Sequence, residues 1–526
     1  MIETKVTDEK KEIKQSLEKV VKGTGFVFFG NIISMFLWLV TSIIITRVWS
    51  YEYFGIVSLL TVIINVSAVL SSLGLRQGVT RSIAISRGKK EYQKIVSYIS
   101  TSIILVLITS FIIAVFLFIF SEQIALTIFN ESALIIPLRI SSFGLPFLVL
   151  IDIIVSIYLG FDDTRPIVYY RSLVMMGLFT IFLLIILLFD LEFISVFYAY
   201  VLSMALAFTL LIIRSTKGIS YKKLIKRERL KTPEAKQLLI FSLPLLGTAM
   251  LQFIITWTDT IMLGIIKTTA EVGLYNLSHS LATLVSFPLG ALITIYLPIL
   301  SGLYAKRKFT EIKRIFAIIT KWICSITLPL FIFIFLFSET VLYHLFGIVN
   351  SQMAVIALRI LSLAFIINNF VGPCGSTLVA MGYSRFIMFS TLSTAILNII
   401  LNLFLIPFFS IIGAALASSI SIISINLIKF SKLYKVSGAQ PISKNLAKPT
   451  LIFILLVIPA LLFLQQGQIL NGPITIGILF LFYIIYFGII IVSKSIDKED
   501  IDLLMTVEKK MGKNIRRIRK FLSKFV

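Results

Sequence analysis

The stretch PLRISSF at residues 137–143 returns in the second half of the chain as ALRILSL at 357–363, an offset of 220 residues. In each copy an arginine, Arg139 or Arg359, interrupts an otherwise apolar run. Ordered self-similarity at one period indicates a duplicated structural unit. Four further pairs keep the same order at nearly the same offset: FSEQ (120–123) with FSET (337–340), EYFGIVSL (52–59) with AEVGLYNL (270–277), KKEYQKIV (89–96) with KFTEIKRIF (308–316), and TRP (164–166) with SRF (384–386).

The composition indicates that the duplicated unit lies in a membrane. Of the 526 residues, 58% are hydrophobic, more than a soluble protein of this length could cover with polar surface. Apolar runs long enough to cross a bilayer as helices recur along the chain. The sequence therefore predicts an all-α polytopic membrane protein with about fourteen transmembrane helices. The predicted spans are 24–46, 54–75, 96–120, 134–159, 166–189, 193–213, 238–266, 272–300, 315–337, 354–380, 386–408, 411–430, 446–465 and 472–493.

The net charge of +24 is unevenly distributed. Basic residues concentrate in alternate connections, above all in 214–237, whereas the other connections carry mainly acidic residues. The positive-inside rule then places both termini in the cytoplasm and the chain in the cell (plasma) membrane as a multi-pass protein. The excess charge is thus a topology signal that also favours contact with anionic membrane lipids. No nucleic-acid partner is expected, because no basic–aromatic binding module is present.

Each copy of the repeat holds six spans, an even number, so the two copies have the same orientation. This arrangement predicts an N-lobe and a C-lobe around a central cavity that opens to alternate sides of the membrane. The last two spans have no counterpart in the first copy. The predicted plan is an amphipathic cytoplasmic N-terminus (1–23), the N-lobe (24–213), a basic cytoplasmic linker (214–237), the C-lobe (238–430), two extra helices (431–493) and a basic amphipathic cytoplasmic C-terminus (494–526).

Three stretches carry a family resemblance: GLRQGVTRSIAISRGK (74–89), DTIMLGIIKTTAEVGLYNLS (259–278) and NIILNLFLIPFFSIIGAALASSIS (398–421). They resemble the Wzx-type oligosaccharide flippases of the MATE-like flippase superfamily, and the resemblance extends from about residue 20 to 495. It implies a fourteen-helix protein that moves a polyprenyl-pyrophosphate-linked oligosaccharide from the cytoplasmic to the outer leaflet. It also implies a mechanism similar to that of the lipid II flippases, with a cationic central cavity.

Three arginines are candidates for binding the (pyro)phosphate of such a substrate. Arg139 and Arg359 lie inside predicted spans, where a charge usually faces a cavity or a partner. The alternative is that both snorkel, since each is near the outer end of its span. The resemblance places Arg81 at the cytoplasmic mouth of the cavity, but it could equally be an ordinary positive-inside residue.

Other polar residues inside the spans are further candidates. Asp152 and Asp259 are predicted to couple an ion or to balance a cavity arginine. Asn398 and Asn402 share one helix face and could bind sugar hydroxyls or bond to a neighbouring helix. Asn31 is the strongly polar residue of the first span and a further candidate for substrate binding. Asn368 and Asn369, just before GPCG at 372–375, indicate a broken helix.

Nothing in the sequence supports an enzyme. The two cysteines and two histidines have no metal-ligand spacing, and no catalytic residues, metal or cofactor are predicted. The expected function is a flippase for a lipid-linked anionic glycan, with membrane lipids and the glycan assembly machinery as candidate partners. The alternatives are a MATE-like exporter of organic cations, which should have acidic rather than basic cavity residues, and an envelope scaffold without inward-facing charges.

Overall fold

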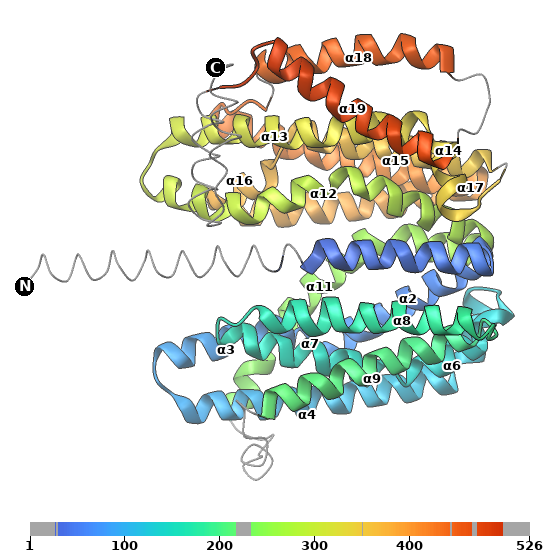
Figure 1. Ribbon diagram of the computed structural model, residues 1–526. Helices are drawn as coiled ribbons and strands as arrows, with labels where there is room; N and C mark the ends of the chain where they lie inside the picture. Colours follow the sequence, from blue (N-terminus) through green and yellow to red (C-terminus); the bar gives the residue numbers. More distant parts are fainter. Residues whose placement is uncertain are drawn as a thin grey trace, which may run out of the picture. The chain divides into compact units, whose positions relative to one another are not determined.

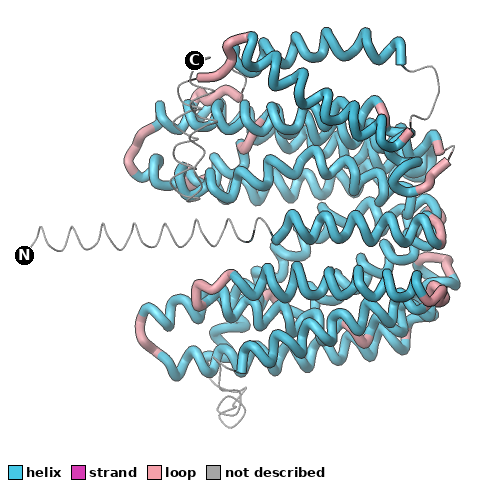
Figure 2. Tube along the Cα trace, in the orientation of Figure 1, coloured by secondary structure: helices cyan, strands magenta, loops and turns pink. Residues whose placement is uncertain are grey.

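The computed structural model describes residues 27, 30–216, 233–349, 351–441, 444–464 and 471–497. Over this part of the chain the secondary structure is helical, with no strand (Figure 2). Ten of the described helices are long and apolar enough to cross a bilayer, or up to 11 if a bent pair counts as one span. The chain is therefore an all-α multi-pass membrane protein, as the sequence predicts.

The helices form two compact units (Figure 1). Unit 1 comprises residues up to Asn276 together with Asn402–Ile411, and unit 2 comprises the rest. The helices of unit 1 are Gly30–Val48, α2 (Tyr51–Ser72), α3 (Leu75–Gly88), α4 (Tyr92–Ile119), α5 (Ser121–Gln123), α6 (Ile135–Ser142), α7 (Leu145–Gly160), the π-helix η3 (Ile167–Val174), α8 (Met175–Leu188), α9 (Ser195–Thr216), α11 (Pro233–Ile266) and the first turns of α12 (Thr269–Ala305). Unit 2 contains the remainder of α12, α13 (Phe309–Leu336), α14 (Ser338–Phe346), α15 (Gln352–Val371), α16 (Cys374–Ala380), most of α17 (Ser384–Ser437), α18 (Lys444–Leu464) and α19 (Gly472–Val492).

The local structure repeats with the sequence. Helices α4 and α13 are both 28 residues long, and each begins and ends 217 residues from the matching residue of the other. A short helix follows in each copy, beginning at Ser121 in the first and at Ser338 in the second. The equal lengths of α4 and α13, and the start of a short helix after each at the same offset, confirm the predicted duplication.

Two further breaks follow the sequence. The predicted break at GPCG is present, because α15 ends at Val371 and Gly372 has a φ of 74°. The predicted boundary between spans 386–408 and 411–430 falls within α17, where Ser410 has the non-helical angles φ 50° and ψ −128°.

The second span is interrupted in a way that positions charged residues. After α2, Leu73 and Gly74 adopt left-handed conformations, and the chain resumes as α3. A Cβ on Gly74 would lie 2.1 Å from the carbonyl oxygen of Ser242, and one on Gly78 would lie 2.0 Å from the Ser242 hydroxyl. Glycine is therefore required at Gly74 by its backbone angles and by the close approach of α11.

The contact-based division differs from the predicted lobes at one helix. The sequence assigns 238–266 to the C-lobe, yet α11 packs against α2 and α3 and belongs to unit 1. In the sequence, α11 is the first helix of the second repeat. In the structure it packs against α2 and α3, which belong to the first repeat. The lobe boundaries remain a prediction. Both amphipathic termini and residues 217–232 of the linker lie outside the described residues.

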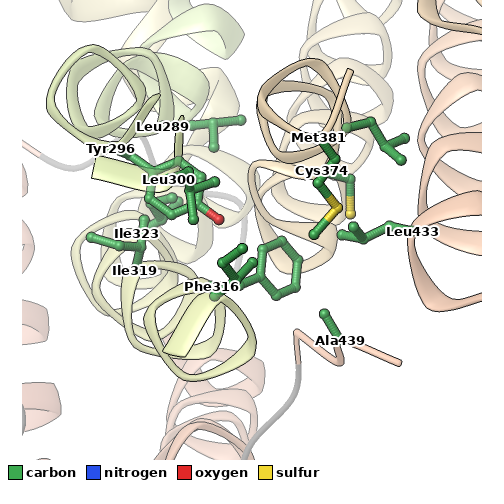
Figure 3. Close-up of a cluster of buried hydrophobic side chains, with 12 residues drawn as sticks. Leu289, Tyr296, Leu300, Phe316, Ile319, Ile323, Cys374, Met381, Leu433 and Ala439 are labelled. Atoms are coloured by element: carbon green, nitrogen blue, oxygen red, sulfur yellow. The ribbon is translucent and has the colours of Figure 1, made fainter. Parts of the chain in front are cut away.

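The core of unit 2 joins α12, α13, α16 and α17 (Figure 3). Tyr296 is buried there, and its hydroxyl lies 2.9 Å from that of Thr377. Cys374 packs in the same cluster, and Cys324 is also buried and unpaired by any disulfide. Both cysteines are thus core residues.

Candidate functional site: a cationic cluster in unit 1

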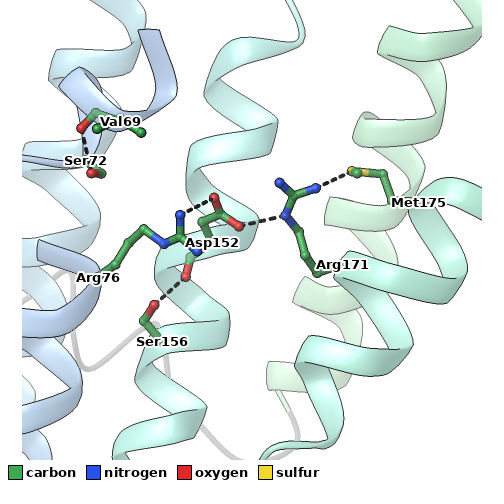
Figure 4. A network of polar contacts seen from close by, with 7 residues as sticks. All are labelled: Val69, Ser72, Arg76, Asp152, Ser156, Arg171 and Met175. Carbon is green, nitrogen blue, oxygen red and sulfur yellow. Dashed lines mark hydrogen bonds and ion pairs between the residues drawn. The ribbon is translucent and has the colours of Figure 1, made fainter. Parts of the chain in front are cut away.

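A buried carboxylate in α7 holds two arginines from different segments of unit 1 (Figure 4). Arg171 donates from Nε to Asp152 Oδ1 over 2.9 Å, and Arg76 Nη1 lies 3.3 Å from Asp152 Oδ2. The second Arg171 contact runs from Nη1 to the sulfur of Met175 at 3.6 Å. The cluster brings together residues separated by up to 95 positions in the sequence.

The local backbone fixes the position of each group. Arg76 stands at the start of α3, directly after the left-handed turn, and Arg171 lies in the π-helix η3. The Thr80 hydroxyl donates to the Ser156 carbonyl over 2.7 Å, which joins α3 to α7 one turn from Asp152.

The electrostatic balance of the cluster is positive. Asp152 is 6% exposed, and a carboxylate so buried requires compensating partners. Two guanidinium groups face one carboxylate, which leaves one positive charge in excess. The side chain of Arg76 is 51% exposed, so its guanidinium has a face that an anion can approach. Asp152 is therefore the counter-ion of Arg76 and Arg171, and its roles in ion coupling and in a cavity remain predictions.

Arg171 was not identified as a candidate from the sequence. It lies within the predicted span 166–189, and a charge inside a span is the signal that selected Arg139 and Arg359. The same signal also identifies Lys321 of α13, which is 7% exposed and lies 2.7 Å from Asp497 Oδ2 in unit 2.

Arg139 and Arg359 each contact the region that joins a 28-residue helix to the short helix after it, but through different partners. Arg139 Nε donates to the Ser121 hydroxyl over 2.8 Å, and its Nη2 lies 3.5 Å from Glu122. Arg359 Nε donates to the Phe335 carbonyl over 3.0 Å. Arg359 thus bonds a carbonyl in the last turn of α13, where carbonyls lack helical partners and the helix dipole favours a cation. Arg139 instead bonds side chains of the short helix α5, just after the end of α4. These contacts give both residues a structural role, and their role in substrate binding remains a prediction.

Asp259 lies in a second network within unit 1. The Tyr275 hydroxyl donates to its Oδ2 over 2.6 Å, and Asn402 Nδ2 donates to its Oδ1 over 2.6 Å. Both donors are neutral groups, unlike the arginines that hold Asp152. Thr260 and Asn276 add a neighbouring hydrogen bond of 3.0 Å.

The candidate asparagines contact different groups. Asn398 is buried in unit 2, with its Nδ2 3.5 Å from the Ser418 hydroxyl. Asn31 is exposed at the start of the first described helix. Asn369 donates to the Val285 carbonyl over 2.8 Å, which makes it a bond between helices of unit 2. Arg81 stacks over Phe241, with Cζ 4.3 Å from the ring centroid, and lines a groove in unit 1.

Among the described residues, no group of three or more His, Cys, Asp and Glu side chains could hold a metal ion. The chemistry that the Asp152 cluster offers is charge and hydrogen bonding toward an anion.

Comparisons with known proteins identify the family of this chain. Residues 20–304 match the model for polysaccharide biosynthesis proteins, and residues 244–404 match the MatE model. The chain is 26% identical over 166 residues to the "Probable low-salt glycan biosynthesis flippase Agl15" of Haloferax volcanii, which covers 32% of this chain. The match spans 35% of that relative's length.

Solved structures with the same fold include "Lipid II flippase MurJ, inward closed conformation", with a TM-score of 0.65, 17% identity and coverage of 89% of this chain and 98% of that one. A multidrug resistance MATE family transporter in an inward-facing conformation gives a TM-score of 0.58, 16% identity and coverage of 77% and 95%. A MOP superfamily transporter from Pyrococcus furiosus, described by its "reverse polarity of binding pocket", gives 0.53, 16% identity and coverage of 81% and 96%. At these identities the likeness concerns the fold. Since more than half of its residues match the family model, the chain belongs to the polysaccharide biosynthesis protein family.

Proposed function

We propose that this protein moves a polyprenyl-(pyro)phosphate-linked oligosaccharide from the inner to the outer leaflet by alternating access. The observation that carries the proposal is the excess positive charge of the Arg76–Asp152–Arg171 cluster in a member of the polysaccharide biosynthesis family. An organic cation would be repelled by that charge, whereas a pyrophosphate is attracted to it.

The cluster suits a phosphate ligand in two ways. Guanidinium groups bind phosphate oxygens bidentately, and a fixed orientation reduces the entropy lost on binding. Asp152 supplies that orientation, because it holds Arg171 by a hydrogen bond and Arg76 by an ion pair. The exposed face of Arg76 then receives the phosphate, and Arg171 adds positive potential from behind the carboxylate.

Translocation by this route breaks no covalent bond and requires no cofactor. The lipid tail remains in the bilayer while the headgroup crosses. With both termini cytoplasmic and an inside-negative membrane potential, outward movement of an anion is favoured by roughly 2.3 kcal/mol per charge per 100 mV.

Asp259 is the better candidate for coupling an ion. It is buried among the neutral donors of Tyr275 and Asn402, a setting in which a carboxylate can exchange a proton or a small cation. Asp152, held by two arginines, serves the substrate anion instead. Asn31 and Asn398 are proposed to contact the headgroup or its sugars during passage.

The test is equilibrium binding by the full-length protein in neutral detergent. Fluorescent pyrophosphate-linked sugars on undecaprenyl and on dolichyl carriers are titrated against wild type, Arg76→Gln and Arg171→Gln. Lys306→Gln, which removes one exposed cation from the end of α12, is the charge-matched control. The proposal expects at least tenfold weaker binding for either arginine variant, an unchanged control, and competition by free pyrophosphate.

Other outcomes would reassign the site. Wild-type affinity in Arg76→Gln and Arg171→Gln, with loss in an Arg139→Gln, Arg359→Gln double variant, would move the anion site to the repeated arginines. Binding of ethidium in place of the lipid-linked sugar would support an organic-cation exporter and reject the flippase proposal.

A further inference from the structure

A second basic site lies in unit 1, apart from the Asp152 cluster. It is a groove of about 730 Å³ where α3, the start of α4 and the first turns of α11 meet. Neither Arg76, Asp152 nor Arg171 is among its lining residues. Pro244, which lies inside α11, forms part of its wall.

The polar part of the groove is strongly cationic. Its lining includes Arg81, Lys89, Lys94 and Lys236 but a single acid, Glu91. Glu91 is already engaged, because its Oε2 lies 3.1 Å from Lys94 Nζ. Within the described part of the chain, Arg81, Lys89 and Lys236 form no ion pair with an acid. Three uncompensated cations around one groove favour an anionic ligand.

The rest of the groove is apolar. Ile240 is 62% exposed and Ile85 is 41% exposed, and Phe241, Pro244 and Leu245 continue the wall along α11. Large exposed apolar side chains beside unpaired cations fit an amphiphile with an anionic head better than a soluble anion.

The depth of the groove fits the same ligand. Lys94 and Lys236 lie just outside the predicted spans 96–120 and 238–266, whereas Ile240 and Leu245 lie just inside the second. By the positive-inside rule this is the cytoplasmic boundary of the membrane. A lipid at that depth presents its phosphate to the lysines and its first acyl carbons to α11, as in basic pockets between helices that bind acidic lipid headgroups.

We propose that this groove binds the phosphate headgroup of an anionic glycerophospholipid of the inner leaflet, as a resident lipid distinct from the transported substrate. Arg81 and Lys236 hold the phosphodiester from α3 and α11, and Lys89 adds charge at the rim. The lipid thereby joins α3, which carries Arg76, to α11. This inference concerns binding of a membrane lipid and does not depend on the proposed flippase activity.

The test uses the purified full-length protein, delipidated in dodecyl maltoside. Thermal unfolding is followed with added phosphatidylglycerol, phosphatidylcholine or inorganic phosphate at matched concentrations. The proposal expects phosphatidylglycerol to raise Tm by several degrees beyond phosphatidylcholine, because a ligand that binds only the folded state stabilises it. Inorganic phosphate alone is expected to raise Tm little.

Substitutions in the groove test whether the lipid binds there. Lys89→Gln, Lys236→Gln removes two exposed cations with no packing cost, and Arg81→Gln provides a second, independent probe. Lys306→Gln, Lys435→Gln removes the same charge from exposed positions of unit 2 and is the matched control. At least tenfold weaker phosphatidylglycerol binding in the groove variants, with the control unchanged, supports the proposal.

Three results would overturn it. Equal stabilisation by phosphatidylglycerol and phosphatidylcholine would show that the negative charge of the headgroup does not contribute to binding. Equal stabilisation by inorganic phosphate would make the groove a soluble-anion site. Displacement of phosphatidylglycerol by the lipid-linked sugar, with the same dependence on Lys236, would make it an entry site for substrate.

Discussion

The substitution Gly55→Ala should disrupt a backbone-to-backbone contact between equivalent helices of the two repeats. A Cβ on Gly55 would lie 1.8 Å from the carbonyl oxygen of Thr269, and one on Gly273 would lie 1.9 Å from that of Tyr51. Gly55 and Gly273 occupy matching positions in EYFGIVSL and AEVGLYNL. The start of α2 and the start of α12 therefore cross with only glycine between them, as small residues permit in membrane helices.

The size of the effect follows from these distances. Real Cβ atoms essentially never approach a heavy atom within 3.0 Å, so one of the helices must move by more than 1 Å. Overpacking typically costs about 1–3 kcal/mol, and the upper end applies because a backbone carbonyl cannot rotate away like a side chain. Alanine has a higher helix propensity than glycine, so the same substitution also stabilises the helix by up to about 1 kcal/mol. The expected net loss is about 2 kcal/mol, which corresponds to a Tm lower by roughly 4–8 °C for a large domain.

The assay is thermal unfolding of purified variants in one detergent, with Gly177→Ala as the control. A Cβ on Gly177 in α8 would meet nothing within 4 Å, so that variant should be neutral or slightly stabilised. The double variant Gly55→Ala, Gly273→Ala should cost less than the sum of the single variants, because one separation of the helices relieves both clashes. A Gly55→Ala protein as stable as Gly177→Ala would refute the reasoning.

Three further outcomes are expected from the described contacts. Asp152→Asn should lower Tm by several degrees, since it leaves two arginines without their shared counter-ion, and an unchanged Tm would show that the carboxylate is dispensable. Lys321→Met should accelerate proteolysis near the C-terminal end of the described chain, because it releases the 2.7 Å contact to Asp497; equal digestion rates would contradict this. The hydrogen bond from Arg165 lowers the pKa of Asp163, so its stabilisation is present above the ordinary value of 3.8 and is lost as pH falls through the lowered pKa. The Tm difference between wild type and Asp163→Asn should therefore vanish in acid, and a difference that persists below that pKa would show that the carboxylate charge is not responsible.

The fold was predictable from the sequence because its determinants are local. Apolar runs mark the helices, and the repeated phrases mark the duplication that α4 and α13 reproduce. Glycine, proline and asparagine in GPCG and its flanks mark the break after Val371. These signals each depend on neighbouring residues, so no long-range contact is needed to recognise them.

The candidate site was only partly predictable because it depends on distant contacts. Asp152 and Arg76 were recognisable as charges, but their pairing with Arg171 requires α7, α3 and η3 to meet. The pair Asn398 and Asn402 illustrates the same limit. Their spacing places them on one helix face, yet one bonds to Ser418 and the other to Asp259. Spacing along a helix does not specify which neighbour each residue meets.

The most direct test of the central claim is headgroup flipping in proteoliposomes. Wild type, an Arg76→Gln, Arg171→Gln double variant and the control Lys306→Gln are reconstituted with a fluorescent polyprenyl-pyrophosphate sugar, and the outer leaflet is quenched. Wild type and control should expose the label to the quencher at equal rates, and the double variant should be at least tenfold slower while retaining its fold. Undiminished flipping by a folded double variant would contradict the claim that the Arg76–Asp152–Arg171 cluster carries the anion across the membrane.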